Sequence, residues 1–236
     1  MEGVPPVETT GQVRWFKRPT PGMTYLVSLD PSMGTGGDYA AIQVFELPTF
    51  EQVGEWHHNM TPMNQQVRIL QGINKHIHDS IMEKDTSASP QIFYSMENNT
   101  IGEAALMRVM DIGEENIMGM FLSEPIRKGH RRKFRRGFNT TAKHKIDACT
   151  KFKELVEGGK MKINSQLLIS EMKDFVATGL SYKAKPGQHD DLVSSCLLMT
   201  RMMKVLADFD PKIFEKWTDR SSEMTTPMPI FGNFYG

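Results

Sequence analysis

Four carboxylates draw attention because each comes where an apolar stretch gives way to a polar turn. Asp30 ends an apolar run, and Glu97 follows another. The adjacent pair Asp190 and Asp191 precedes an apolar helical pattern. Carboxylates gathered in one place repel one another and need a cation between them, and two hard divalent ions about 3.5–4 Å apart can hydrolyse a phosphodiester. Together these acids predict a site for Mg²⁺, with Mn²⁺ as the next choice.

Each of these acids also has an interpretation without chemistry. Asp30 stands before Pro31, which is typical of a turn. Asp190 and Asp191 would serve as ordinary helix caps that complement the helix dipole. Spacing alone leaves both interpretations open. Two other chemistries are not supported, because Gly34–Gly37 lacks the Gly-Lys-Ser/Thr ending of a P-loop and no Cys/His spacing suits zinc.

A basic cluster lies between the second and third acidic positions. Seven of the ten residues from 127 to 136 are Lys or Arg, and Phe134 is among them. The glycine and the lack of apolar periodicity predict an exposed loop. Such a loop could follow a phosphate backbone, with the aromatic ring against a base or sugar. The alternative is a solvated loop without a ligand. The cations of the cluster are Arg127, Lys128, Arg131, Arg132, Lys133, Arg135 and Arg136.

Strands interleaved with helices are predicted to carry these residues. The glycines at 34, 36 and 37 suit the positive φ of a tight turn, so a hairpin is expected around them. Thr100 with Glu103 has the spacing of a capping box. The expected strands are 25–30, 40–45, 50–56, 91–96, 117–122, 161–163 and 180–182, and the expected helices are 62–81, 100–110, 141–156, 165–176 and 190–206. An α/β sheet of this kind could bring the acids to one edge.

Composition bounds the class of protein. The 236 residues balance 28 basic against 28 acidic side chains, so the overall charge indicates no partner. No apolar run approaches the roughly 18–20 residues of a membrane span. Cys149 and Cys196 fall in apolar helical patterns, which predicts small core residues in a reducing compartment. Residues 1–22 are predicted as a leader or linker, 23–207 as one domain and 208–236 as a tail.

Three motifs, in this order and spacing, resemble the nuclease part of the large terminase subunits of tailed bacteriophages, of the T-even-like type. They are Leu29-Asp30-Pro31-Ser32-Met33-Gly34 with Asp38-Tyr39-Ala40-Ala41, Met96-Glu97-Asn98-Asn99-Thr100 with Gly102, and Gly187-Gln188-His189-Asp190-Asp191-Leu192-Val193. The similarity extends from about residue 23 to residue 206. Each motif alone is weak, but their combination is specific.

The resemblance implies a ribonuclease H-like fold, with a mixed central sheet flanked by helices and a two-metal site. Matched by position, Asp30, Glu97 and Asp191 are the catalytic and metal-binding acids. Asp190 is a further candidate ligand, and Asp38 and His189 are candidate supporting residues. Some relatives carry another acid where this chain has Met33, so the resemblance does not supply a fourth acidic contact there.

The function implied is a Mg²⁺-dependent endonuclease that cuts concatemeric viral DNA during packaging, in the cytoplasm of the infected bacterial host. Its expected partners are double-stranded DNA, the terminase ATPase domain, the small terminase subunit and the capsid portal. No association with a membrane is expected. The basic cluster, with Lys143 and Lys145, would steer the duplex. This sequence has no P-loop, so the motor is expected elsewhere. Two alternatives are a Holliday-junction-resolvase-like nuclease and a non-catalytic DNA or portal docking module.

Overall fold

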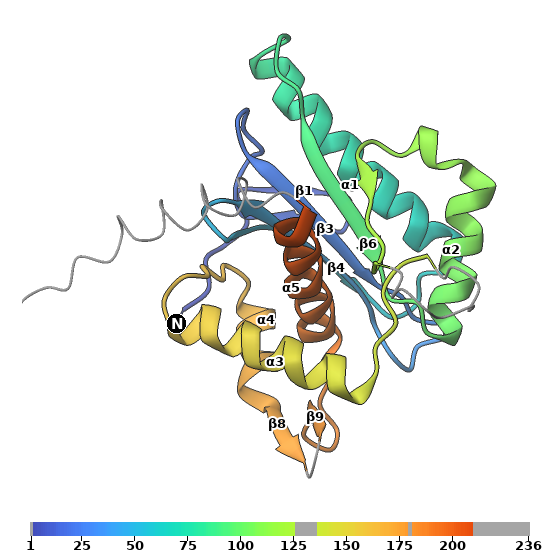
Figure 1. The fold of residues 1–236 in the computed structure, drawn as a ribbon, viewed down its shortest axis with the longest axis vertical. Coiled ribbons are helices and arrows are strands. Elements are labelled where there is room, and N and C mark those ends of the chain that lie inside the picture. The colour runs from blue at the N-terminus through green and yellow to red at the C-terminus, as the bar shows by residue number, and fades with distance from the viewer. Residues whose placement is uncertain (1, 126–135, 179–180, 210–236) are drawn as a thin grey trace, which may run out of the picture.

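The computed structural model describes residues 2–125, 136–178 and 181–209 (Figure 1). These residues form a mixed sheet in the strand order β1-β2-β5-β4-β3-β6-β7, with helices on both faces. Its strands are β1 (Glu8–Thr10), β2 (Val13–Trp15), β3 (Thr24–Asp30), β4 (Ala40–Leu47), β5 (Glu51–His58), β6 (Gln91–Met96) and β7 (Met120–Phe121). The predicted α/β architecture is confirmed.

β3 lies at the centre of the arrangement that positions the acids. It pairs antiparallel with β4 and parallel with β6. Alternate residues of a strand point to opposite faces, so Tyr25, Val27 and Leu29 join one core and Leu26 joins the other. Because both faces are covered, the strand is an almost continuous apolar run rather than an alternating one.

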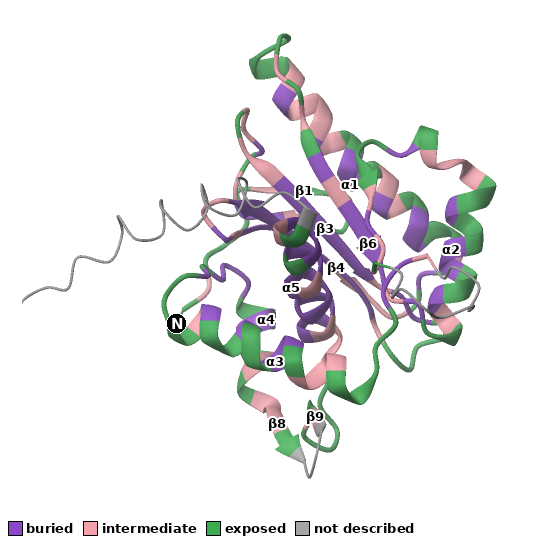
Figure 2. Ribbon diagram, in the orientation of Figure 1, coloured by how far each residue is buried: buried purple, intermediate pink, exposed green. Residues whose placement is uncertain are grey.

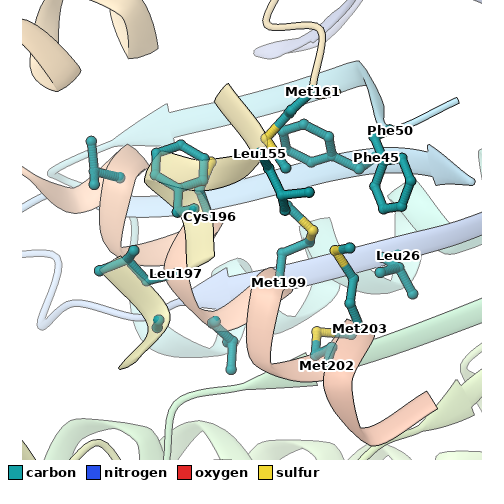
Figure 3. Close-up of a cluster of buried hydrophobic side chains, with 14 of the residues drawn as sticks. Leu26, Phe45, Phe50, Leu155, Met161, Cys196, Leu197, Met199, Met202 and Met203 are labelled. Carbon is teal, nitrogen blue, oxygen red and sulfur yellow. The ribbon is translucent and has the colours of Figure 1, made fainter. Parts of the chain in front are cut away.

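Helices α1 (Met63–Lys84) and α2 (Thr100–Ile112) cover one face of the sheet, and a short 3₁₀ helix (Glu114–Asn116) follows. The other face is covered by α3 (Ala142–Glu157), α4 (Gln166–Asp174) and α5 (Asp191–Phe209). Figure 3 shows α5 contributing Cys196, Met199 and Met202 to this second core. Figure 2 shows buried residues along the strands and along α5. The sheet therefore separates two cores.

Side-chain caps begin several of the helices where the sequence predicts a start. The side chains of Thr141 and Ser165 accept hydrogen bonds from backbone N–H groups in the first turns of α3 and α4. α2 differs from the predicted capping box at Thr100, because its N-cap is Asn99, which accepts from Gly102 N.

The structure corrects the expectation of an extended leader. Residues 8–10 and 13–15 form β1 and β2, and β2 pairs with β5. Trp15 is 1% exposed and stacks on His76, so this segment belongs to the core of the sheet. The predicted tail, from residue 210 onward, lies outside the described residues.

Four further local predictions need correction. The predicted helix 165–176 ends at Asp174, and β8 (Phe175–Thr178) follows, pairing with β9 (Ser181–Ala184) as a hairpin. The predicted strand 161–163 reduces to a single bridge between Lys162 and Glu51. The strand predicted over 117–122 is only β7. In the glycine turn, Gly34 and Gly36 have positive φ, but Gly37 does not. Over the described ranges, no helix is both long and apolar enough to cross a membrane.

Candidate metal centre

Asp30 and Glu97 come together at the edge of the sheet where β3 and β6 end. The parallel register places Leu29 opposite Met96, and the residue that follows each of them is an acid. Glu97 N donates to Leu29 O at 3.4 Å, which continues the pairing to this edge. Glu97 Oε2 accepts from Asn99 Nδ2 at 3.1 Å, so the residue that caps α2 also orients this carboxylate.

Asp191 reaches the same region because it is the first residue of α5, which packs across β3. The two elements are joined by reciprocal buried hydrogen bonds: Ser28 Oγ donates to Ser195 O at 2.8 Å, and Ser195 Oγ donates to Ser28 O at 2.9 Å. Ser28 precedes Asp30 by two residues, and Ser195 lies about one helical turn after Asp191. This contact fixes how the helix and the strand present their acids.

The carboxylates act on one another electrostatically. The pKa of Asp30 is raised well above its usual value by burial, then by the charges of Glu97, Asp191 and Asp190, while Lys145 opposes the shift. Burial, followed by the charge of Asp190, raises the pKa of Asp191 to about 6. Asp191 Oδ2 is buried without a hydrogen-bond partner. A cation among these groups would relieve the repulsion and satisfy that oxygen, so this donor set suits a hard divalent ion.

Asp30 and Glu97 line a small cavity of about 80 Å³, together with Thr140, Lys145 and Arg201. Within residues 2–125, 136–178 and 181–209, no three His, Cys, Asp or Glu side chains converge closely enough to enclose a metal ion as they lie. Asp30 and Glu97 thus share a cavity, while Asp190 and Asp191 act on Asp30 through their charges. Enclosing an ion requires these side chains to move together.

Comparison with known proteins decides the family. A family model described as "Terminase RNaseH-like domain" matches residues 27–202, well over half of the chain. The chain belongs to the terminase RNase H-like domain family. The ribonuclease H-like fold and the terminase resemblance inferred from the sequence are confirmed, while the narrower T-even-like type stays a prediction.

Solved terminase nuclease structures share the fold. The large terminase nuclease of thermophilic phage G20c, in a crystal structure with bound magnesium, is 17% identical with a TM-score of 0.60, over 84% of this chain and 90% of that one. The nuclease domain of Thermus phage P74-26 is 17% identical with a TM-score of 0.59, over 84% and 88%. The human cytomegalovirus terminase nuclease domain, manganese-soaked and inhibitor-bound, is 15% identical with a TM-score of 0.53, over 76% and 82%.

In this terminase domain, Asp190 is held differently from Asp191. Its Oδ2 accepts from Ala184 N of β9 at 3.2 Å and lies 3.9 Å from Lys145 Nζ of α3. Its charge still raises the pKa of both Asp30 and Asp191. Asp190 therefore lies beside the other acids while being tied to its neighbours.

The two predicted supporting residues lie next to Asp191. His189 Nδ1 is 3.6 Å from Asp191 Oδ2, and the His189 ring meets the Tyr39 ring edge-on at 4.9 Å. Asp38 is exposed in the glycine turn, and its charge adds to the raised pKa of Asp191. Both supporting residues thus border the acidic region.

The predicted DNA-binding cations divide into three groups. Arg127, Lys128, Arg131, Arg132, Lys133 and Arg135 lie outside the described residues. Arg136 pairs with Glu114 and covers the Phe121 ring, so its guanidinium has a local partner. Lys143 is exposed on α3, whereas Lys145 lines the acidic cavity.

The residues that flank the basic segment lie against Glu97. Asn98 N donates to Phe138 O at 2.7 Å, and Phe138 N donates to Met96 O at 3.2 Å. Arg201 of α5 pairs with Glu124 on one side of the segment and donates to Thr140 Oγ1 at 2.9 Å on the other. The described residues on either side of the basic cluster are thereby anchored near Glu97.

Sequence reasoning missed Arg201, His57 and Glu171. Glu171 of α4 lies beside His57 and is largely shielded from solvent, and this burial raises its pKa to about 8. None of the three has a local motif, because their partners come from other elements. A signal existed only for Glu171, as an acid on an amphipathic helix whose neighbours Leu168 and Ile169 are core residues.

Proposed function

We propose that this chain is a divalent-metal-dependent DNA endonuclease that cuts concatemeric viral DNA during genome packaging. The observation that carries this proposal is that Asp30 and Glu97 line one cavity of a terminase-family fold, while Asp191 begins the helix that packs against β3. The raised pKa values of the two aspartates, and an Asp191 oxygen without a hydrogen bond, describe carboxylates that a bound cation would stabilise. The G20c nuclease was solved with magnesium, cobalt and zinc, and the cytomegalovirus nuclease domain was soaked with manganese, which supports Mg²⁺ with Mn²⁺ as a substitute.

The chain's own residues divide the work of phosphodiester hydrolysis. Asp30, Glu97 and Asp191 would hold the metal ions, with Asp190 as a neighbouring acid. The ions would supply a nucleophilic water and stabilise the leaving oxygen. Lys145 adds a positive charge at the wall of the same cavity, which suits a phosphate. Backbone contacts from the basic cluster would hold the duplex with little sequence preference.

The terminase context supplies the proposed partners. They are double-stranded DNA, the terminase ATPase domain, the small terminase subunit and the capsid portal, in the cytoplasm of an infected bacterial host. Nothing in the described residues favours the junction-resolvase or docking-module alternatives over the nuclease.

The test is cleavage of supercoiled plasmid in Mg²⁺ or EDTA. We expect nicking and linearisation only with metal, and a loss of roughly 100-fold or more in Asp30→Asn, Glu97→Gln and Asp191→Asn. Asp79→Asn is the matched control, because Asp79 is an exposed carboxylate on α1 that pairs with Lys75. Cutting in EDTA, or unchanged cutting by the site variants, would contradict the proposal. DNA binding without cutting under any metal would favour a docking module.

A further inference from the structure

The first turn of α5 is capped by a side chain from another helix. Leu192 N and Val193 N donate to Glu171 Oε2 of α4 at 2.9 and 3.2 Å. The first N–H groups of a helix have no acceptor within the helix. The side chain of the residue just before the helix usually accepts hydrogen bonds from them. Here that residue is Asp190, whose carboxylate instead accepts from Ala184 N and faces Lys145.

This division of roles leaves the Asp191 carboxylate outside the helix cap. If Asp190 or Asp191 turned back to cap the helix, its oxygens would be engaged with backbone N–H groups. Because Glu171 accepts those hydrogen bonds, Asp191 Oδ2 is left buried without a hydrogen bond, with His189 Nδ1 at 3.6 Å. The cap from α4 is therefore coupled to the availability of the candidate metal ligand.

A second series of contacts connects Glu171 to Asp191. Glu171 Oε1 lies 3.8 Å from His57 Nε2, and the two side chains are only 11% and 12% exposed. His57 stacks on Tyr39 at 4.2 Å, Tyr39 meets the His189 ring edge-on, and His189 lies beside Asp191. Glu171 thus contacts the helix that carries Asp191 and begins a chain of rings that ends beside it.

Removing the Glu171 carboxylate from water costs free energy, so filling space in the core does not explain why a glutamate stands here. A buried acid must be hydrogen-bonded or neutralised, and an apolar side chain of the same size would fill the space without that cost. Burial raises the pKa of Glu171 to about 8, while the two backbone hydrogen bonds oppose the shift. The two hydrogen bonds that Glu171 accepts from backbone N–H groups of α5 explain why a glutamate stands at this position.

We propose that Glu171 is a positioning residue, which fixes the first turn of α5 and thereby directs the Asp191 carboxylate toward the metal ions. The inference rests on the proposed nuclease function and goes beyond it by assigning a role to a residue outside the acidic motifs. Residues that orient metal ligands typically change metal affinity by 10–100-fold when replaced, which sets the size of the expected effect.

The experiment compares Glu171→Leu with Glu171→Gln by calorimetric titration with Mn²⁺ and by plasmid nicking. Leu removes the acceptor while keeping bulk, and we expect Mn²⁺ affinity to fall by about 10-fold or more, with a parallel loss of nicking. Gln keeps an oxygen that can accept from Leu192 N and Val193 N, so it should stay within about 3-fold of the natural chain in Mn²⁺ affinity.

A control separates positioning from general stability. Ile77→Val shortens a core side chain of α1 on the opposite face of the sheet, so it lowers the melting temperature without touching α5. We expect it to bind Mn²⁺ as the natural chain does. Wild-type Mn²⁺ affinity in Glu171→Leu, despite a similar loss of melting temperature, would overturn the positioning role and leave a structural cap.

Two further outcomes are distinguished by the same titrations. If Glu171→Leu does not fold, Glu171→Asp withdraws the acceptor by one methylene group, and wild-type affinity in that variant would overturn the inference. If the natural chain itself neither binds Mn²⁺ nor cuts DNA, the proposed function fails and the inference fails with it. Binding and cutting by the natural chain, unaffected by Glu171→Leu, would reject only the role of Glu171.

Discussion

The Asp30 carboxylate lowers the stability of the metal-free fold at the place where the proposed chemistry needs its charge. Its pKa is raised by burial and by three neighbouring acids, so ionisation is disfavoured in the folded chain. Residues that serve chemistry often have this property, and replacing them stabilises the protein while abolishing activity. Glu171, which lies outside the sequence motifs, is a second acid whose ionisation is disfavoured by burial although a role is proposed for its carboxylate.

The first prediction follows from this conflict. Asp30→Asn should stabilise the metal-free chain by about 0.5–2 kcal/mol, or roughly 2–4 °C per kcal/mol, because the amide does not repel Glu97. A raised folded-state pKa means that stability is present at low pH and is lost as pH rises through that pKa, so the gain should be larger at pH 8 than at pH 5. Thermal unfolding in EDTA measures it.

Addition of Mg²⁺ should reverse the order of the melting temperatures, since a bound ion stabilises only the chain that can hold it. Asp79→Asn is again the control. In EDTA it should lower the melting temperature, because hydrogen bonds from Lys75 and His78 lower the pKa of Asp79 and so favour its ionised form in the folded chain. A less stable Asp30→Asn in EDTA would contradict the electrostatic account.

At the scale of elements, the junction between β6 and α2 places Glu97 next to a crowded turn. A Cβ at Gly102 would lie 1.7 Å from Glu97 O, so α2 begins against the backbone of the candidate ligand. Only glycine allows this approach, which explains a residue of poor helix propensity inside the first turn.

The second prediction compares two helical glycines. Gly102→Ala should destabilise the fold by about 1–3 kcal/mol and weaken Mn²⁺ binding, because α2 and Glu97 must move apart. Gly72→Ala, at an exposed position of α1 where a Cβ meets nothing within 4 Å, should stabilise by about 0.5–1 kcal/mol and leave Mn²⁺ binding unchanged. Urea unfolding and Mn²⁺ titration measure both, and equal effects would reject the steric argument.

The third prediction concerns the basic cluster. Replacing Arg131, Arg132 and Arg135 with alanine should weaken DNA binding and lower the slope of log affinity against log salt by roughly 0.9 for each phosphate that is no longer neutralised. The matched triple of Lys153, Lys160 and Lys173, all exposed, removes the same charge elsewhere and should change the slope less. Fluorescence anisotropy across salt concentrations measures both. Unchanged affinity and slope would remove the cluster from DNA binding.

How far the sequence predicts the structure differs among the elements. β3, α1, β6 and α5 follow from local apolar patterns, and the acids at the ends of β3 and β6 come to one edge because parallel strands share it. β2 has only three residues and pairs with β5 some forty positions later, so no local period reveals it. Glu171 caps a helix that begins twenty residues further on, and the β8–β9 hairpin interrupts a helical pattern, so tertiary contacts decide both.

At the scale of the whole molecule, the N-terminal segment completes the sheet that separates the two cores. Arg14 pairs with the buried Glu55 at 2.7 Å, and Lys17 pairs with the buried Glu46. Glu55 is also held by Ser165, the N-cap of α4, at 2.8 Å. The segment therefore pairs with acids on β4 and β5, and the β5 acid also contacts the start of the helix that carries Glu171.

The fourth prediction tests this integration. Trp15→Ala should cost about 3–5 kcal/mol, because the ring is buried between the sheet and α1. Val7→Ala, in the same segment but 61% exposed, should stay within about 0.5 kcal/mol. Chemical denaturation compares them. Similar small effects at both positions would restore the leader interpretation.

The paired serines between β3 and α5 have a consequence for altering metal selectivity. Because Ser28 and Ser195 each donate to the other's backbone, the helix can neither slide nor rotate on the strand without breaking buried hydrogen bonds. One residue of slippage would turn Asp191 by about 100°. To change which ion this protein prefers, one should therefore replace the ligand side chains themselves. The orientation of Asp191 relative to Asp30 is fixed by the contact between α5 and β3 and cannot be adjusted.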